Sequence, residues 1–382
     1  MTQTPASNRE HALRRGPLRR GWTTGACATA AAKAAYQALL GGGFPDPVEI
    51  RLPKGEAPRF ALARERRGEG WCEAAIVKDA GDDPDVTHGA LISARVAALP
   101  VGSGVRFKAG EGVGTVTLPG LPLAPGEPAI NPVPRRMMCE AIAEVAAVWG
   151  ASGDVEIEVS IAGGEELAKR TANPRLGILG GLSVLGTTGI VRPFSCAAWI
   201  ASIHRGIDVA RAAGLAHLAG CTGSTSEAAV RALHGLPERA MLDMGDFAGG
   251  VIKYVRQHPV ARLTIGGGPG KMVKLAQGLL DLHSGRGSVD FGWLSGVLEE
   301  ADAPAGLVAS ARGANTAKQV FDEAATAGFP LARLIAERAL SSVRETLAGA
   351  PVLADVVVVD RDGAVIAQAG GPESAAAEGP HG

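Results

Sequence analysis

The second half of the chain repeats one local pattern, in which a short apolar run is followed by a glycine-rich loop and a helical segment. The run at 215–219 leads into the loop at 220–224, and the run at 262–265 leads into the loop at 266–270. Strands that alternate with helices through short loops are typical of a parallel sheet with right-handed crossovers. We therefore expect a Rossmann-like α/β domain over residues 175–369, ending in a strand hairpin.

The first half has a mixed pattern. An alanine-rich helix, capped by Thr24, is expected to run to about residue 40, and a second helix spans 135–149. The segment 155–161 alternates acidic and apolar residues, as a half-buried strand does. Other strand-like runs, separated by Gly, Pro and Asp turns, lie at 48–52, 71–77, 90–99, 105–108 and 115–118.

These patterns give an α/β fold class with two parts. The first is an α+β N-terminal domain over 18–165 with antiparallel strand pairing, and the second is the parallel-sheet, Rossmann-like C-terminal domain over 175–369. The ends, 1–17 and 370–382, are expected to be flexible, as the termini of most domains are.

Charge and composition exclude several classes of protein. The 382 residues include 38 Lys and Arg against 39 Asp and Glu, so no excess of positive charge favours nucleic acid as a partner. No apolar run approaches the roughly 18 residues of a membrane span. The five cysteines contain no C-x-x-C pair, which indicates reduced thiols and a cytoplasmic protein. We expect no resident metal, and the sequence leaves a homo-oligomer open.

The loop that contains Gly220, Thr222 and Gly223 lies between a predicted strand and a predicted helix. Backbone N–H groups at such a helix start favour anions and polar ligand groups. Asp243 lies 20 residues beyond Gly223, at the end of the next strand, where nucleotide-binding folds place a carboxylate on a ribose. A plain tight turn before a helix explains the same residues without a ligand.

The second glycine loop, with Gly266, Gly268 and the following Lys271, lets the backbone approach a ligand closely. It lacks the spacing of a phosphate-binding loop, because Met272 follows the lysine. A helix entry with Pro269 in its first turn is the alternative interpretation.

Thr187, Thr188 and Arg192 form a third candidate site. Hydroxyl groups and a guanidinium in one loop are suited to binding carboxylates. A linker between the two domains is the alternative.

Asp79 and Asp82 belong to a loop with four Asp in seven residues, which would suit either a hard cation or a set of Asx turns. His283 is a candidate general acid or base, or an ordinary helix cap.

Five segments, taken together and in order, resemble the cobalt-precorrin-5B (C-1)-methyltransferase family, CbiD, of cobalamin biosynthesis. The resemblance extends over about residues 18–368. It rests on Thr23-Thr24-Gly25-Ala26-Cys27-Ala28, on residues 77–87 with the sequence VKDAGDDPDVT, on residues 186–193 (GTTGIVRP), on residues 244–247 (MGDF) and on residues 270–276 (GKMVKLA).

The resemblance implies a methyltransferase that uses S-adenosyl-L-methionine to methylate cobalt-precorrin-5B at C-1, giving cobalt-precorrin-6A. Its partner would be an anionic cobalt-corrinoid, a tetrapyrrole-derived small molecule. We expect the methyl donor on the two glycine loops with Asp243 at its ribose, and the macrocycle between the domains. The residues expected to bind the macrocycle are Thr23, Thr24, Lys78, Thr187, Thr188, Arg192 and Lys271.

Asp79, Asp82 and His283 are the candidates for proton handling or for positioning the substrate. The segment 221–227 carries fewer basic residues than the resemblance suggests, which weakens a role for that loop in binding carboxylates. Two other classes remain: an NAD(P)-linked oxidoreductase or other nucleotide-dependent α/β enzyme, and a non-catalytic carrier of tetrapyrrole intermediates.

Overall fold

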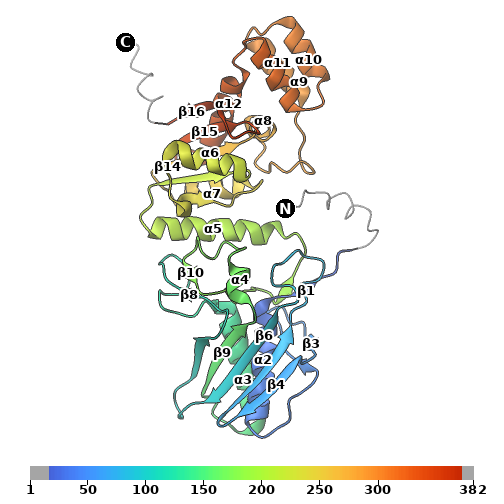
Figure 1. The fold of residues 1–382 in the computed structure, drawn as a ribbon, viewed down its shortest axis with the longest axis vertical. Helices are drawn as coiled ribbons and strands as arrows, with labels where there is room; N and C mark the ends of the chain where they lie inside the picture. The colour runs from blue at the N-terminus through green and yellow to red at the C-terminus, as the bar shows by residue number, and fades with distance from the viewer. Residues whose placement is uncertain (1–16, 372–382) are drawn as a thin grey trace. The chain divides into compact units, whose positions relative to one another are not determined.

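The computed structural model describes residues 17–371, which divide into two units (Figure 1). Within those residues unit 1 comprises 17–117 and 122–195, and unit 2 comprises 118–121 and 196–371. The predicted boundary lay between 165 and 175, whereas the chain passes from unit 1 to unit 2 between Ser195 and Cys196. The ends predicted to be flexible lie outside the described residues, except for Pro17, Gly370 and Gly371, and Gly370 is the last residue of a strand.

Unit 1 is built on a five-stranded sheet with the order β4-β5-β6-β9-β7. Neighbouring strands are antiparallel except β7 and β9, which are parallel, so the expectation of antiparallel pairing is wrong at this one edge. The chain reaches β9 through the helix at 132–149, and β9 then inserts between β6 and β7. Because β9 runs antiparallel to β6, it runs parallel to β7. The strands are β4 (Arg64–Gly68), β5 (Trp71–Val77), β6 (Leu91–Ala98), β7 (Val105–Ala109) and β9 (Val155–Ile161).

The alanine-rich helix α2 (Thr24–Leu39) packs against β5, β6 and the helix α3 (Pro132–Trp149). Its small side chains let the helix axis approach both neighbours closely, and nearly all of them are buried. The N-cap is Thr23, whose Oγ1 accepts a hydrogen bond from the backbone N–H of Ala26 at 3.2 Å, and not Thr24 as predicted.

Three short strand pairs and one helical turn complete unit 1. The pairing of β1 with β11 joins the start of the unit to its end, because it aligns Trp22 with Ile190. The elements are β1 (Gly21–Trp22), β2 (Val48–Glu49), β3 (Arg59–Phe60), β8 (Thr115–Val116), α4 (Gly164–Ala168), β10 (Ile178–Leu179) and β11 (Ile190–Val191).

Unit 2 contains the parallel sheet that the sequence predicts. The strand order is β13-β12-β14-β15-β16; the first four strands are parallel, and β16 pairs antiparallel with β15 in the predicted hairpin. The strands are β12 (His217–Cys221), β13 (Met241–Leu242), β14 (Arg262–Gly267), β15 (Leu353–Val359) and β16 (Val365–Gly370).

Helices connect and surround these strands, and the unit has its own apolar core. They are α5 (Cys196–Ala212), α6 (Ser224–His234), the 3-10 helix η1 (Glu238–Ala240), α7 (Ala248–Gln257), α8 (Pro269–Ala276), α9 (Phe291–Glu300), α10 (Ala305–Gly313), α11 (Ala317–Thr326) and α12 (Leu331–Leu347).

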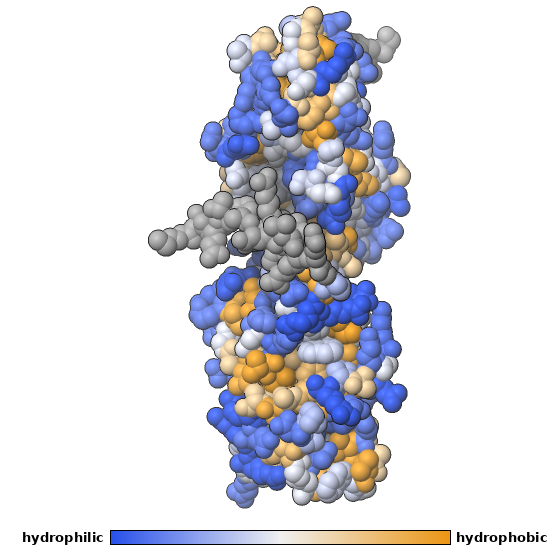
Figure 2. All heavy atoms as spheres, turned by 90° about the vertical axis from the view of Figure 1, so that its right-hand side faces the viewer, coloured by the Kyte–Doolittle hydropathy of each residue, from blue (hydrophilic) through white to orange (hydrophobic). Residues whose placement is uncertain are grey.

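On the face shown in Figure 2, apolar side chains form patches that hydrophilic side chains interrupt. Among residues 17–371, no helix combines the length and the apolar character that crossing a bilayer requires.

Candidate functional site

The carboxyl edge of the unit 2 sheet is the first candidate site. β12 is the first of these strands along the chain, yet it lies between the second, β13, and the third, β14. Parallel sheets bind ligands at such a reversal of strand order, beyond the carboxyl ends of the strands. Thr222 and Gly223 follow β12, Asp243 follows β13, and Gly268 follows β14, so the fold brings these four residues to one edge.

The glycines predicted for this site have two different roles. Gly220 and Gly266 are buried within strands, where an added Cβ would lie 2.9 Å from Met244 Sδ and 2.6 Å from Val230 Cγ2, respectively. These two glycines serve packing. Gly223 is exposed with open space around its Cβ position, and an added Cβ at Gly268 would meet only the Val359 carbonyl oxygen, at 3.8 Å. A ligand at this edge would therefore meet Gly223 and Gly268.

Asp243 and Thr222 flank the open glycines. The Asp243 side chain is exposed, and its backbone oxygen accepts a hydrogen bond from Trp199 Nε1 at 2.9 Å. Sequence reasoning missed Gly267, where an added Cβ would lie 2.7 Å from Thr222 Oγ1. The run of three consecutive glycines, 266–268, could have indicated this residue. Such a run arises where glycines that are needed for close packing within a strand are followed directly by a loop glycine.

Two of the segments that carry the family resemblance meet in unit 2. Lys271 Nζ lies 2.6 Å from Asp246 Oδ1 and 2.9 Å from the carbonyl oxygen of Leu282, to which it donates. Asp246 belongs to the MGDF segment and Lys271 to the segment that starts at Gly270. Its pairing with Asp246 means that Lys271 is already partly neutralised within the unit.

His283 lies in the loop between α8 and α9, so its interpretation as a helix cap is wrong. The ring Nδ1 of His283 accepts a hydrogen bond from the backbone N–H of Gly285 at 3.0 Å. The backbone N–H of His283 donates to Asp281 Oδ1 at 3.1 Å. Accepting at Nδ1 places the proton of the neutral ring on Nε2. Nearby, Arg286 pairs with Asp281 at 2.7 Å and donates to Cys196 Sγ at 2.8 Å.

A cavity of about 1090 Å³ opens beside Gly268, within unit 2. Its polar lining includes Lys271 and Lys274 of α8, and its apolar lining includes Phe291, Phe321 and Phe329. A volume of this size suits a ligand as large as a nucleoside derivative.

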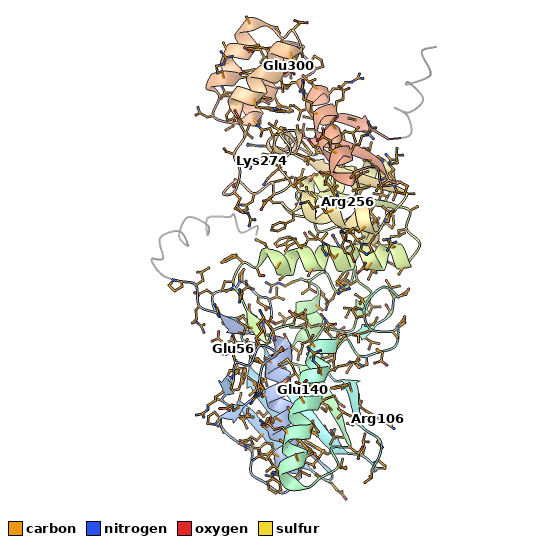
Figure 3. The ribbon with its side chains drawn as sticks, turned by 180° about the vertical axis from the view of Figure 1, so that it is seen from behind. Glu56, Arg106, Glu140, Arg256, Lys274 and Glu300 are labelled. Carbon is orange, nitrogen blue, oxygen red and sulfur yellow. The ribbon has the colours of Figure 1, made fainter. Side chains whose placement is uncertain are left out.

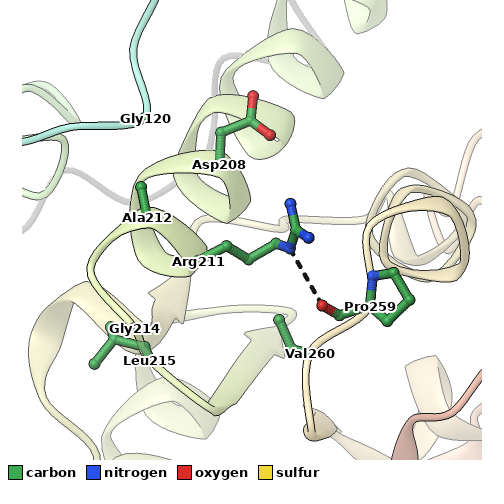
Figure 4. A pocket seen from close by; sticks show the side chains of 8 residues that line it. All are labelled: Gly120, Asp208, Arg211, Ala212, Gly214, Leu215, Pro259 and Val260. Atoms are coloured by element: carbon green, nitrogen blue, oxygen red, sulfur yellow. Dashed lines mark hydrogen bonds between the residues drawn. The ribbon is translucent and has the colours of Figure 1, made fainter. Parts of the chain in front are cut away.

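A second pocket, of about 550 Å³, lies at the opposite edge of the same sheet (Figure 4). Its lining includes Leu215 and Val260, which precede β12 and β14, and Arg211 Nε donates across it to the Pro259 carbonyl oxygen at 3.2 Å. Because parallel sheets bind ligands at their carboxyl edge, this pocket is the weaker candidate.

Three motifs that are far apart in the sequence meet within unit 1. The backbone N–H of Trp22 donates to the Asp79 carbonyl oxygen at 2.7 Å, and that of Thr23 donates to the Gly189 carbonyl oxygen at 3.0 Å. An added Cβ at Gly186 would lie 2.3 Å from Thr23 Oγ1. The Thr23 segment, the Asp-rich loop and the loop at 186–193 thus form one cluster.

The side chains of this cluster differ in exposure. Thr23 and Thr24 are buried. Thr188 Oγ1 closes a turn, since it donates to the carbonyl oxygen of Ile190 and accepts from the backbone N–H of the same residue. Thr187 and Arg192 are exposed, and the Arg192 guanidinium has no hydrogen bond or ion pair with any residue between 17 and 371. Arg192 is therefore the group of this cluster best placed to meet a carboxylate from outside.

The Asp-rich loop is held by its own hydrogen bonds. Asp79 pairs with the Arg19 guanidinium and accepts from the backbone N–H of Gly81 at 2.9 Å, which together lower the pKa of Asp79 to about 2. Asp82 Oδ2 accepts from the backbone N–H of Arg19 at 2.7 Å. A carboxylate with so low a pKa is a weak base, so this geometry favours the Asx-turn interpretation for Asp79. In the described part of the chain, no cluster of three His, Cys, Asp or Glu is suited to a metal.

Lys78 is also engaged internally. Its side chain is 1% exposed, and Nζ lies 2.5 Å from Asp85 Oδ2 and 2.7 Å from Thr87 Oγ1. Cys27 is buried nearby, and burial raises the pKa of its thiol to about 12, which removes it as a nucleophile at neutral pH.

Fold and site together define the class: an α/β protein whose parallel-sheet unit presents open glycines and a carboxylate where such sheets bind small molecules. Two family descriptions match the sequence, CbiD over residues 11–193 and the CbiD C-terminal domain over residues 281–370. A cobalt-precorrin-5B C(1)-methyltransferase from Paramagnetospirillum magneticum is 62% identical over 92% of this chain and 98% of its own length. The chain belongs to the CbiD family.

Other proteins are similar to the chain as well. A cobalt-precorrin-5B C(1)-methyltransferase from a Bradyrhizobium species is 61% identical, covering 92% of this chain and 93% of the relative. A crystal structure of the cobalamin biosynthesis protein cbiD from Archaeoglobus fulgidus is 28% identical, with a TM-score of 0.39, and covers 70% of this chain and 83% of that one.

Proposed function

We propose that this protein is a methyltransferase that methylates cobalt-precorrin-5B at C-1, giving cobalt-precorrin-6A in cobalamin biosynthesis. The observation that carries the proposal is the 62% identity to a protein of that activity along 98% of that protein's length. So complete a match leaves little of the relative without a counterpart in this chain.

The proposed methyl donor is S-adenosyl-L-methionine, which when bound supplies a methyl group on a positively charged sulfur. The carboxyl edge of the unit 2 sheet fits it: Gly223 and Gly268 leave room for close approach, and Asp243 offers a carboxylate to the ribose hydroxyls. The chain's own contribution is to align the donor with the acceptor carbon and to exclude water.

The proposed acceptor site uses the exposed side chains of the unit 1 cluster. Arg192 supplies a guanidinium suited to a macrocycle carboxylate, and Thr187 adds a hydroxyl. Lys78, Asp79 and Asp82 act indirectly in this proposal, since their charges hold the loop that packs against residues 19–22, directly before Thr23. His283 is retained as a candidate for moving a proton through Nε2.

Incubation of the purified protein with cobalt-precorrin-5B and adenosylmethionine carrying a ¹³C-labelled methyl group tests the proposal. We expect one labelled methyl on the product, at C-1 by NMR, and none with heat-inactivated protein. Macrocycle binding without transfer would support the carrier alternative. NADH binding without transfer would support the oxidoreductase alternative.

A further inference from the structure

The cavity in unit 2 contains a buried lysine that the proposed function has not used. Lys274 lies on α8 (Figure 3), its side chain lines the cavity, and it is 6% exposed. Its Nζ donates to the carbonyl oxygen of Leu282 at 3.1 Å. A buried ammonium group is costly unless a negative charge compensates it.

The surrounding charges do not balance. Lys271 and Lys274 both donate to the same Leu282 carbonyl oxygen, at 2.9 Å and 3.1 Å, so two ammonium groups meet at one neutral acceptor. Of the two carboxylates that act on Lys274, Asp246 pairs with Lys271, and Asp281 pairs with Arg286. The cavity lining as a whole has five Lys or Arg residues against three Asp residues, so it also carries an excess of positive charge. Within residues 17–371, Lys274 has no carboxylate in ion-pair distance.

The charge imbalance affects the pKa of Lys274. Burial lowers its pKa, the charge of Lys271 lowers it further, and Asp246 and Asp281 oppose the change only in part. An anion that entered the cavity would remove this cost and gain charge-assisted hydrogen bonds.

The chemistry of the anion follows from the proposed function, on which this step rests. Both proposed substrates carry carboxylates: the methionine part of the donor has one, and the macrocycle has several. We propose that Lys274, with Lys271 beside it, binds a substrate carboxylate in the unit 2 cavity along α8.

A Lys274→Met variant tests this, because methionine has a similar length and no charge. Calorimetric titrations would use three probes: S-adenosylhomocysteine, 5′-methylthioadenosine and cobalt-precorrin-5B. 5′-Methylthioadenosine has the nucleoside of S-adenosylhomocysteine but lacks its amino-acid part. Each of these two nucleosides is titrated with and without the macrocycle. Lys253→Met is the matched control, since Lys253 is exposed on α7. Lys274→Arg keeps the charge, and thermal unfolding checks that every variant is folded.

If the donor supplies the carboxylate, Lys274→Met weakens S-adenosylhomocysteine binding about tenfold and leaves methylthioadenosine unchanged. If the macrocycle supplies it, the variant weakens cobalt-precorrin-5B binding about tenfold instead. Lys274→Arg should retain most of the affinity, and Lys253→Met all of it.

Unchanged affinity for all three probes, or equal loss for both nucleosides, would overturn the inference. The labelled-methyl assay on the wild-type protein separates this result from a failure of the proposed function. Transfer by the wild type together with wild-type affinities in Lys274→Met would reject the lysine site alone.

Discussion

Lys78 and Arg192 carry the same charge in very different surroundings. Lys78 is buried and bonded to Asp85 and Thr87, whereas Arg192 is exposed. Burial by itself would raise the pKa of Asp85, but the charge of Lys78 and hydrogen bonds from Lys78 and Thr87 outweigh it and lower that pKa. The lysine therefore stabilises unit 1, and the arginine is the one available to a ligand.

Arg192→Ala is expected to weaken cobalt-precorrin-5B binding about tenfold without lowering the thermal unfolding temperature. The side chain makes no ion pair with residues 17–371, so only the contact with a macrocycle carboxylate is lost. Equilibrium titration with the macrocycle measures this. Arg106→Ala, an exposed arginine on β7 (labelled in Figure 3), is the control, and equal affinities in both variants would reject the placement.

Asp243→Asn is expected to weaken S-adenosylhomocysteine binding about tenfold. The two ribose hydroxyls would donate to the two carboxylate oxygens of Asp243, and in asparagine an NH2 group replaces one of these oxygens. Calorimetry on the folded variant measures the loss. Glu345→Gln removes an exposed carboxylate from α12 and should bind as the wild type does. Wild-type affinity in Asp243→Asn would remove this residue from the donor site.

At the scale of elements, the strands of unit 2 are joined by a buried polar network as well as by backbone hydrogen bonds. Thr264 of β14 donates to Asp355 Oδ2 at 2.9 Å, and Arg262 donates to Asp355 Oδ1 at 2.8 Å. His217 Nε2 of β12 lies 2.7 Å from Thr264 Oγ1 and must be the donor, because the threonine proton is used on Asp355. The network links β12, β14 and β15.

This network predicts a loss of stability in mild acid. Burial, with the charge of Arg262, lowers the pKa of His217 to about 4, so the folded protein keeps the ring neutral. The unfolded chain takes up a proton below about pH 6.5, and the free energy of unfolding therefore falls between pH 6.5 and pH 4.

Urea unfolding at pH 7 and pH 5 measures the effect. In His217→Gln we expect the fall to be smaller by about 1–2 kcal/mol, although the variant is less stable at pH 7 through the lost hydrogen bond. The same fall in both proteins would mean that other groups cause it. His234, whose pKa is also lowered by burial, acts in the same direction and is present in both.

At the scale of the whole molecule, each unit has an apolar core of its own. Ile157 is fully buried in the core of unit 1, and Ile252 is fully buried in that of unit 2. The cores share no residue, so each supports the fold of one unit.

We expect calorimetric unfolding in two transitions, each lowered by a different variant. Ile157→Ala and Ile252→Ala should each cost about 2–5 kcal/mol in their own unit, through lost burial and the cavity left behind. A single transition that both variants lower equally would contradict this expectation.

The sequence by itself determined the family, the α/β class and most elements, because apolar periodicity, caps and glycine loops are local signals. Strands β5 and β9 begin and end at the predicted residues, and the terminal hairpin is confirmed. The roles of the predicted site residues remain predictions.

Only the tertiary structure decided which of those residues face outward. It buried Lys78 against Asp85, placed Gly220 and Gly266 inside strands, and inserted β9 beside β7. It also placed the buried Lys274 next to Lys271 with no carboxylate in ion-pair distance among residues 17–371. Burial and ion pairing depend on which distant segments come into contact, and the spacing of residues along a chain carries little information about that.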